Sequence, residues 1–208
     1  MPRNSNRMRG LFSSSAASLG GTLRPGSSPG TFTIIKGEDS IAFAPGSRIE
    51  IEIGGTAAGN QYDQLILTSG FGNFPLGGAV DVRFINGFVP SPGQTFSIIR
   101  YTPNRSGSFS AITGLASSPG TLLVPRYKAG GLDLVVATNP ALKVISANPT
   151  SFRLNFTTST GFNYQVEAST NLVNWTSLSA VIPGDGLTKE LTNSIAGIPA
   201  RFYRLRVE

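Results

Sequence analysis

Two glutamates on one predicted strand are the closest that this sequence comes to a catalytic pair. Glu50 and Glu52 are two residues apart, so an extended strand places both carboxylates on one face, roughly 6.5–7 Å apart. A carboxylate pair near that spacing could serve glycoside hydrolysis. However, Ile49, Ile51 and Ile53 alternate with the glutamates and take the buried face. Glu50 and Glu52 are therefore predicted to lie on a solvated face.

Asp63 is the acidic residue with the most unusual position. It shares parity with Leu65 and Leu67, so its side chain is predicted to point towards the core at the start of a strand. One interpretation is that the carboxylate accepts backbone N–H groups of the preceding turn, residues 59–61. The other is that Asp63 is an oxygen ligand for Ca²⁺. No D-x-D-x-D or GGxGxD run accompanies it, which favours the first interpretation.

Four aromatic residues cluster near predicted loops and are candidate contacts for a carbohydrate or another partner. Sugar recognition by ring stacking would need two or three of these rings to be exposed and coplanar. The alternative is that they plug the ends of a sandwich or solenoid. The four residues are Tyr62, Phe71, Phe74 and Phe88.

Cysteine and histidine are both absent from the chain. Disulfides, thiolate nucleophiles, Cys/His zinc sites and Ser-His-Asp triads are therefore excluded within this chain. Because no convincing carboxylate pair replaces them, we predict a protein without enzymatic activity, catalytic residues or a required cofactor.

The net charge of +6 is unevenly distributed along the chain. Residues 1–30 carry four arginines and no acidic residue. A nucleic-acid binder would be expected to concentrate its positive charge on a folded face, so nucleic acid is not a predicted partner. No apolar stretch reaches the length of about 18 residues that marks a transmembrane helix.

The predicted elements are short strands separated by Gly, Pro, Ser and Asn. No window shows a helical period, and Gly or Pro interrupts the chain almost every ten residues, which indicates an all-β fold. Residues 1–30 are predicted to be a flexible segment without a visible signal peptide, since Leu11-Phe12 is too short for its apolar core. Residues 31–138 are predicted to be a β-rich domain, either a β-sandwich or a short β-solenoid cap.

A second domain is predicted for residues 139–208. Alternating apolar residues in 152–156 and 162–168 flank a Ser-Thr-Gly turn and favour a hairpin. Trp175, the only tryptophan, is predicted to lie in the core. About six short strands around one tryptophan suggest a small β-sandwich of the fibronectin type III or immunoglobulin sort.

Several phrases of the sequence resemble a known family. The segments GSRIEIEIGGTAAGNQYDQL, LGGAVDVRFINGFVPSPGQTFSIIR and SGSFSAITGL resemble the β-strand repeats of bacterial autotransporter passenger regions and of large exported proteins of Verrucomicrobia-like and Planctomycetes-like bacteria. The resemblance covers about 25–138. The segments FNYQVEASTNLVNWTSL and RFYRLRV are similar to small C-terminal sandwich modules of the same exported proteins. The resemblance implies a β-helix, an extracellular or cell-surface location and no catalytic residues.

These observations lead to one functional expectation and one alternative. We expect a non-enzymatic, exported structural or adhesive protein that assembles through β-strand edges and surfaces, as part of a surface layer, fibre or adhesin. Its partners would be copies of itself or an upstream β-helix. The alternative is a carbohydrate-binding module with a polysaccharide partner.

Overall fold

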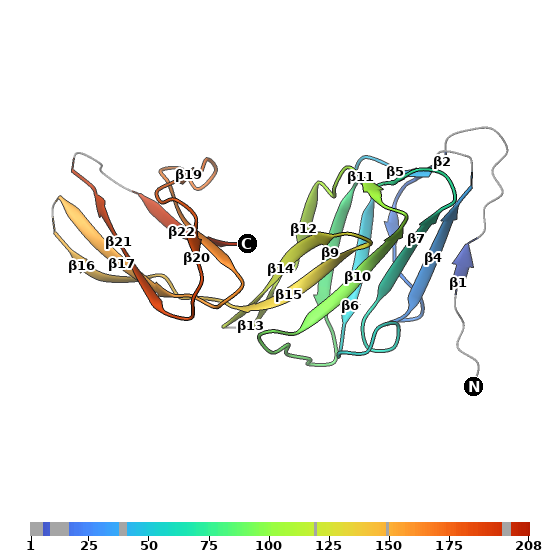
Figure 1. Ribbon diagram of the computed structural model, residues 1–208, viewed down its shortest axis with the longest axis horizontal. Helices are drawn as coiled ribbons and strands as arrows, with labels where there is room; N and C mark the ends of the chain where they lie inside the picture. Colours follow the sequence, from blue (N-terminus) through green and yellow to red (C-terminus); the bar gives the residue numbers. More distant parts are fainter. Residues whose placement is uncertain (1–5, 9–16, 38–40, 119, 149, 197–200) are drawn as a thin grey trace. The chain divides into compact units, whose positions relative to one another are not determined.

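The computed structural model describes residues 6–8, 17–37, 41–118, 120–148, 150–196 and 201–208. These residues form strands, turns and loops and no helix, which confirms the predicted all-β class. The chain divides into two compact units, one of residues 1–118 with 125–136 and the other of 119–124 with 137–208 (Figure 1). The division thus passes through two strands, at 121–128 and 131–138, which precede the predicted boundary at 138/139.

The first unit winds as a short parallel β-solenoid. Each coil is roughly 30 residues long and contributes one strand to each of three sides, so that a strand pairs in parallel with its equivalent in the next coil. Side one holds β2 (Ala17–Leu19), β5 (Ile41–Phe43), β8 (Phe74–Pro75) and β11 (Arg105–Ser106); side two holds β3 (Thr22–Leu23), β6 (Arg48–Ile53), β9 (Ala79–Phe84) and β12 (Ala111–Thr113); side three holds β4 (Thr31–Lys36), β7 (Gln64–Ser69) and β10 (Thr95–Thr102).

The third side extends beyond the coils. β15 (Gly131–Thr138) pairs antiparallel with β10 and is followed in the sheet by β14 (Thr121–Lys128) and β13 (Ala116–Ser118). At the opposite end, β1 (Asn6–Met8) pairs in parallel with β4. Figure 1 shows β4, β7 and β10 side by side within this sheet.

Alternation of side chains explains why these strands stack. Ile49 pairs with Val80 and Ile51 with Val82, and all four side chains are at most 3% exposed. Each such side chain contributes about 1.5–3 kcal/mol when it is fully buried. Because equivalent positions in successive coils carry aliphatic residues, the interior is a continuous column of apolar side chains.

Part of the segment that was predicted to be flexible belongs to the solenoid. β2 and β3 lie within residues 1–30, and they pair in parallel with β5 and β6 of the next coil. Residues 1–5 and 9–16 lie outside the described residues. The polar, Gly-rich composition of 1–30 concealed the two strands because each is only two or three residues long.

The second unit is a β-sandwich of two antiparallel sheets. Phe156 packs against Tyr164 and Phe152 against Tyr203, with ring centroids 5.8 and 4.5 Å apart, so the apolar faces of the sheets meet. One sheet consists of β16 (Lys143–Ala147), β17 (Ser151–Thr157) and β21 (Thr188–Ser194); the other has β18 (Asn163–Ser169) at its centre, with β19 (Thr176–Ser177) and β20 (Ile182–Pro183) on one side and β22 (Phe202–Val207) on the other.

The predicted hairpin between residues 152–156 and 162–168 is wrong. β17 and β18 lie in different sheets and do not pair with each other. Each strand carries its apolar residues on one face, and the connecting turn sets these faces against one another instead of side by side. The backbone N–H of Ser159 donates to Tyr164 Oη at 2.7 Å and fixes this arch.

Trp175 lies outside the core, so that prediction is also wrong. Its ring is half-buried, and the guanidinium of Arg204 lies 4.2 Å from the ring centroid. Its indole Nε1 donates to the backbone oxygen of Leu172 at 3.2 Å. A tryptophan gains more from this cation and hydrogen-bond acceptor than from burial of its N–H without a partner.

Candidate functional site

Asp63 is buried at the start of β7, as its parity predicts. Only 2% of the residue is exposed. Oδ1 accepts the backbone N–H of Gly30 at 2.7 Å, and Oδ2 accepts the backbone N–H of Glu52 at 2.9 Å. The donors are therefore not those of the preceding turn, as the sequence suggested, but come from a neighbouring coil and from the preceding strand β6.

Burial controls the protonation of Asp63. Desolvation raises the pKa of its carboxyl group from the ordinary 3.8 to about 6, against the opposing effect of the two N–H donors and with a small contribution from the nearby Glu52 charge. At neutral pH the ionised carboxylate is therefore poorly solvated, and two hydrogen bonds hold it without a positively charged partner.

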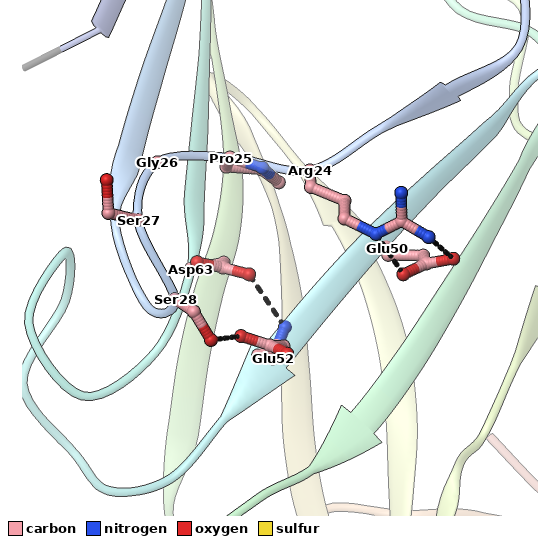
Figure 2. Close-up of a pocket in the computed structure, with 8 residues that line it drawn as sticks. All are labelled: Arg24, Pro25, Gly26, Ser27, Ser28, Glu50, Glu52 and Asp63. Atoms are coloured by element: carbon pink, nitrogen blue, oxygen red, sulfur yellow. Dashed lines mark hydrogen bonds and ion pairs between the residues drawn. The ribbon is translucent and has the colours of Figure 1, made fainter.

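A small pocket of about 150 Å³ opens beside Asp63 (Figure 2). One wall is the turn from Arg24 to Ser28, and the other is the outer face of β6. Figure 2 shows three carboxylates around it, those of Glu50, Glu52 and Asp63.

The two glutamates predicted on a solvated face form contacts across the coils. Arg24 donates to both carboxylate oxygens of Glu50, at 2.7 and 2.8 Å, and Arg83 lies 3.5 Å from Glu50 on the other side. Ser28 donates its hydroxyl to Glu52. The Glu50 side chain is only 12% exposed. Neither carboxylate is therefore arranged as a solvent-facing acid or base.

The turn at the pocket needs glycine. Gly26 has φ of +74°, and a Cβ there would lie 2.4 Å from the Cα of Gly30. This close approach brings the Gly30 N–H to Asp63. In the sequence, the Ser-Ser-Pro-Gly-Thr phrase at 27–31, which recurs at 117–121, indicates a turn here, but it does not reveal that Asp63 is the acceptor.

Contacts within the chain hold the carboxylates of this pocket. Each of its carboxylates already has donors within the chain, and no group of three or more acidic side chains that could hold a metal ion occurs among the described residues. Asp63, the candidate calcium ligand, uses both oxygens for backbone N–H groups. The arrangement fastens the turn of the first coil to the second coil.

The four candidate aromatic residues do not form one platform. Tyr62 and Phe88 both meet Phe96 edge to face, at 5.4 and 6.1 Å between centroids. Phe74 is fully buried against Phe43 at 6.2 Å. Phe71 is 56% exposed and lies in the turn after β7. Tyr62 and Phe88 thus meet at the ring of Phe96, Phe74 lies in the core, and Phe71 lies at the surface.

Comparisons with known proteins add no assignment. No protein-family model matches the chain, and no curated protein is significantly similar to it. The described residues contain no helix with the length and apolar character needed to cross a membrane.

Proposed function

We propose that this chain is a non-enzymatic, exported structural or adhesive protein that assembles through the edges of its β-strands. The observation that supports the proposal is the arrangement of the solenoid ends. The side-two sheet runs β12-β9-β6-β3, so its first and last strands each have one neighbour among the described residues. An unpaired row of N–H and C=O groups recruits a further strand.

The solenoid geometry makes such recruitment repeatable. Coils stack on one another through parallel pairing, and on side two each end presents the same kind of edge. A coil of another copy, or of an upstream β-helix, would continue the column of apolar side chains. The extracellular or cell-surface location follows from the resemblance of the repeat segments, and the engaged carboxylates around Asp63 support a role without catalysis.

The edge of β12 allows a specific test. Ala79 of β9 donates its backbone N–H to Ser47 at 2.9 Å, so the backbone groups of Ala79 point to β6 and those of its register partner Ala111 point to β9. By the alternation of a parallel ladder, the N–H of Ile112 then points away from β9. Ile112→Pro removes this outward donor and no pairing bond of β9. Ile112→Ala is the matched control, because it also shortens the side chain but keeps the N–H.

Assembly is measured by light scattering and electron microscopy of the full chain. We expect particles larger than a monomer for the wild type and for Ile112→Ala, and a smaller size for Ile112→Pro. A wild-type chain that stays monomeric up to its solubility limit, alone and with a β-helix of the resembling kind, would contradict the proposal.

A second candidate function is carbohydrate binding at Phe71, which the 56% exposure of this ring favours. The turn that carries it is held by Ser69, whose hydroxyl donates to the Phe71 oxygen at 2.7 Å, and by Lys36 Nζ, which donates to the same oxygen at 3.1 Å. Saturable retention on an insoluble polysaccharide that Phe71→Ala abolishes would support this candidate. Retention unchanged by Phe71→Ala would remove it.

A further inference from the structure

β22 of the sandwich has a strand neighbour on one side only. It pairs antiparallel with β18, from Phe202 opposite Ser169 to Val207 opposite Tyr164. In the described part of the chain, no strand pairs with its outer edge. Among the described strands, β22 is therefore the edge of this sheet.

The backbone groups at this edge follow from the register. Glu208 and Asn163 exchange both of their N–H to O=C bonds, at 2.8 and 2.9 Å. In an antiparallel ladder the inward and outward groups alternate, so Arg206, Arg204 and Phe202 also face β18. The N–H and C=O groups of Tyr203, Leu205 and Val207 point outward instead, which gives three donors and three acceptors along one line.

The apolar interior of the sandwich is uncovered near the same edge. Val144 on β16 lies directly opposite Leu154, which is buried, so Val144 faces the interior. It is nevertheless 65% exposed. On β22, the side chains of Tyr203, Leu205 and Val207 face the interior, whereas their backbone groups point to the open edge. These three residues are only half-buried.

The topology places these two uncovered regions together. β20, at the other edge of the β18 sheet, continues into β21 through residues 184–187 alone, so that edge lies over β21. The β22 edge then lies over the opposite end of the facing sheet, which is β16. A further strand beside β22 would cover Val144 and complete the sandwich.

We propose that the outer edge of β22 binds an extended peptide segment that has apolar residues at alternate positions and acidic residues between them. The segment adds to the β18 sheet as its next strand. Its apolar side chains enter the uncovered interior over β16, and its carboxylates lie on the outer face beside Arg204 and Arg206. This inference concerns the second unit and is independent of the solenoid ends.

The charge on the outer face determines the chemistry of the partner. Arg204 and Arg206 have side chains 49% and 46% exposed, and among the described residues their ion-pair partners are Glu167, on the β18 side, and Glu208. Carboxylates on an added strand would contact the guanidinium groups from the open side. Lysines or arginines there would lie opposite like charges, which destabilises a pair of strands.

The same charges disfavour β22 of a second copy as the occupant. If Leu205 faces its own equivalent in an antiparallel pair, Arg204 of one copy faces Arg206 of the other. Shifting the register by two residues sets an arginine against the identical arginine. An edge with this pattern resists pairing with itself.

The test uses fluorescence anisotropy of the full chain with two labelled peptides of about six residues. One alternates isoleucine with glutamate, and the other alternates isoleucine with lysine. We expect the glutamate peptide to bind about tenfold more tightly, because two cross-strand charge pairs change sign. Arg206→Gln should reduce this preference.

Val207→Pro tests the backbone contribution. It removes an outward N–H and leaves the bonds to β18 in place, as edge strands tolerate. Val207→Ala is the control that keeps the N–H, and thermal melts check that both variants fold. We expect Val207→Pro to weaken binding of the glutamate peptide about tenfold or more relative to Val207→Ala, through one lost hydrogen bond and a steric block.

Three results would overturn the proposal: no binding of the glutamate peptide, equal binding by Val207→Pro and Val207→Ala, or a wild-type dimer that Val207→Pro dissociates. The last result would identify a second copy as the occupant. Assembly through the solenoid is measured separately with Ile112→Pro, so failure of either idea leaves the other measurable.

Discussion

Replacing Asp63 with asparagine should make the first unit more stable at neutral pH than the wild type. The carboxyl group is buried, and its pKa is raised from the ordinary 3.8 to about 6, chiefly by desolvation. A raised pKa in the folded state means that the native protein binds the proton more tightly than the unfolded chain. The associated stability is therefore fully present below about pH 4 and decreases as the pH rises through about 6.

The magnitude follows from the two pKa values. A difference of about two pH units corresponds to about 3 kcal/mol of unfolding free energy lost between pH 4 and pH 8. Asparagine stays neutral at every pH and resembles the protonated carboxyl group, because it keeps one acceptor for the N–H of Gly30 or Glu52. We therefore expect Asp63→Asn to match the wild type within about 1 kcal/mol at pH 4.

Hydrogen exchange of the amides in β4, β6 and β7 measures this stability locally, without interference from the second unit. The difference between Asp63→Asn and the wild type should grow in favour of the variant from pH 4 to pH 8. A wild type that gains protection over the variant as the pH rises would refute the reasoning, since it would mean that the two N–H donors outweigh desolvation.

Three further changes test the packing. Leu65→Ala, at a fully buried position between two coils, should lower the unfolding free energy by about 2–5 kcal/mol in urea titrations, and a loss below about 1 kcal/mol would contradict the solenoid core. Gly114→Ala should lower the melting temperature more than Gly87→Ala. Both positions have positive φ, but only at Gly114 would a Cβ meet a β9 carbonyl, at 1.9 Å. Equal decreases in melting temperature would refute the contact. Arg204→Gln should shift the fluorescence of Trp175 by removing the cation above its ring, and an unchanged spectrum would argue against that contact.

The sequence was informative where side-chain parity decides the structure. Ile49, Ile51 and Ile53 are at most 1% exposed, and Asp63 is buried with Leu65, as alternation predicts. Parity assigns a face to each residue because successive side chains of a strand point to opposite sides. It therefore located the core of both units and the buried acid.

The partners of each strand could not be read from the same pattern. β17 and β18 have apolar faces that suit a hairpin and an arch equally well, and the arch is the observed form. Gly30 lies 33 residues from Asp63, so this donor to the buried carboxylate is invisible to any local motif. The ion pair between Glu50 and Arg24 could not be predicted either, because these two residues are also far apart along the chain.

Polar contacts between coils determine the register of neighbouring strands, which the apolar column alone does not determine. Ile and Val at every second position would pack almost as well if one coil slipped by two residues, because the same faces would still be buried. Arg24, Glu50 and Arg83 come from three successive coils, and their ion pairs are satisfied together in only one register. Gln64 adds a donor to the Ser97 oxygen of the next coil at 2.9 Å. These contacts would each contribute little to stability, since the arginines are exposed. Their effect is to select one alignment, which also determines the alignment of the edges at the two ends of the solenoid.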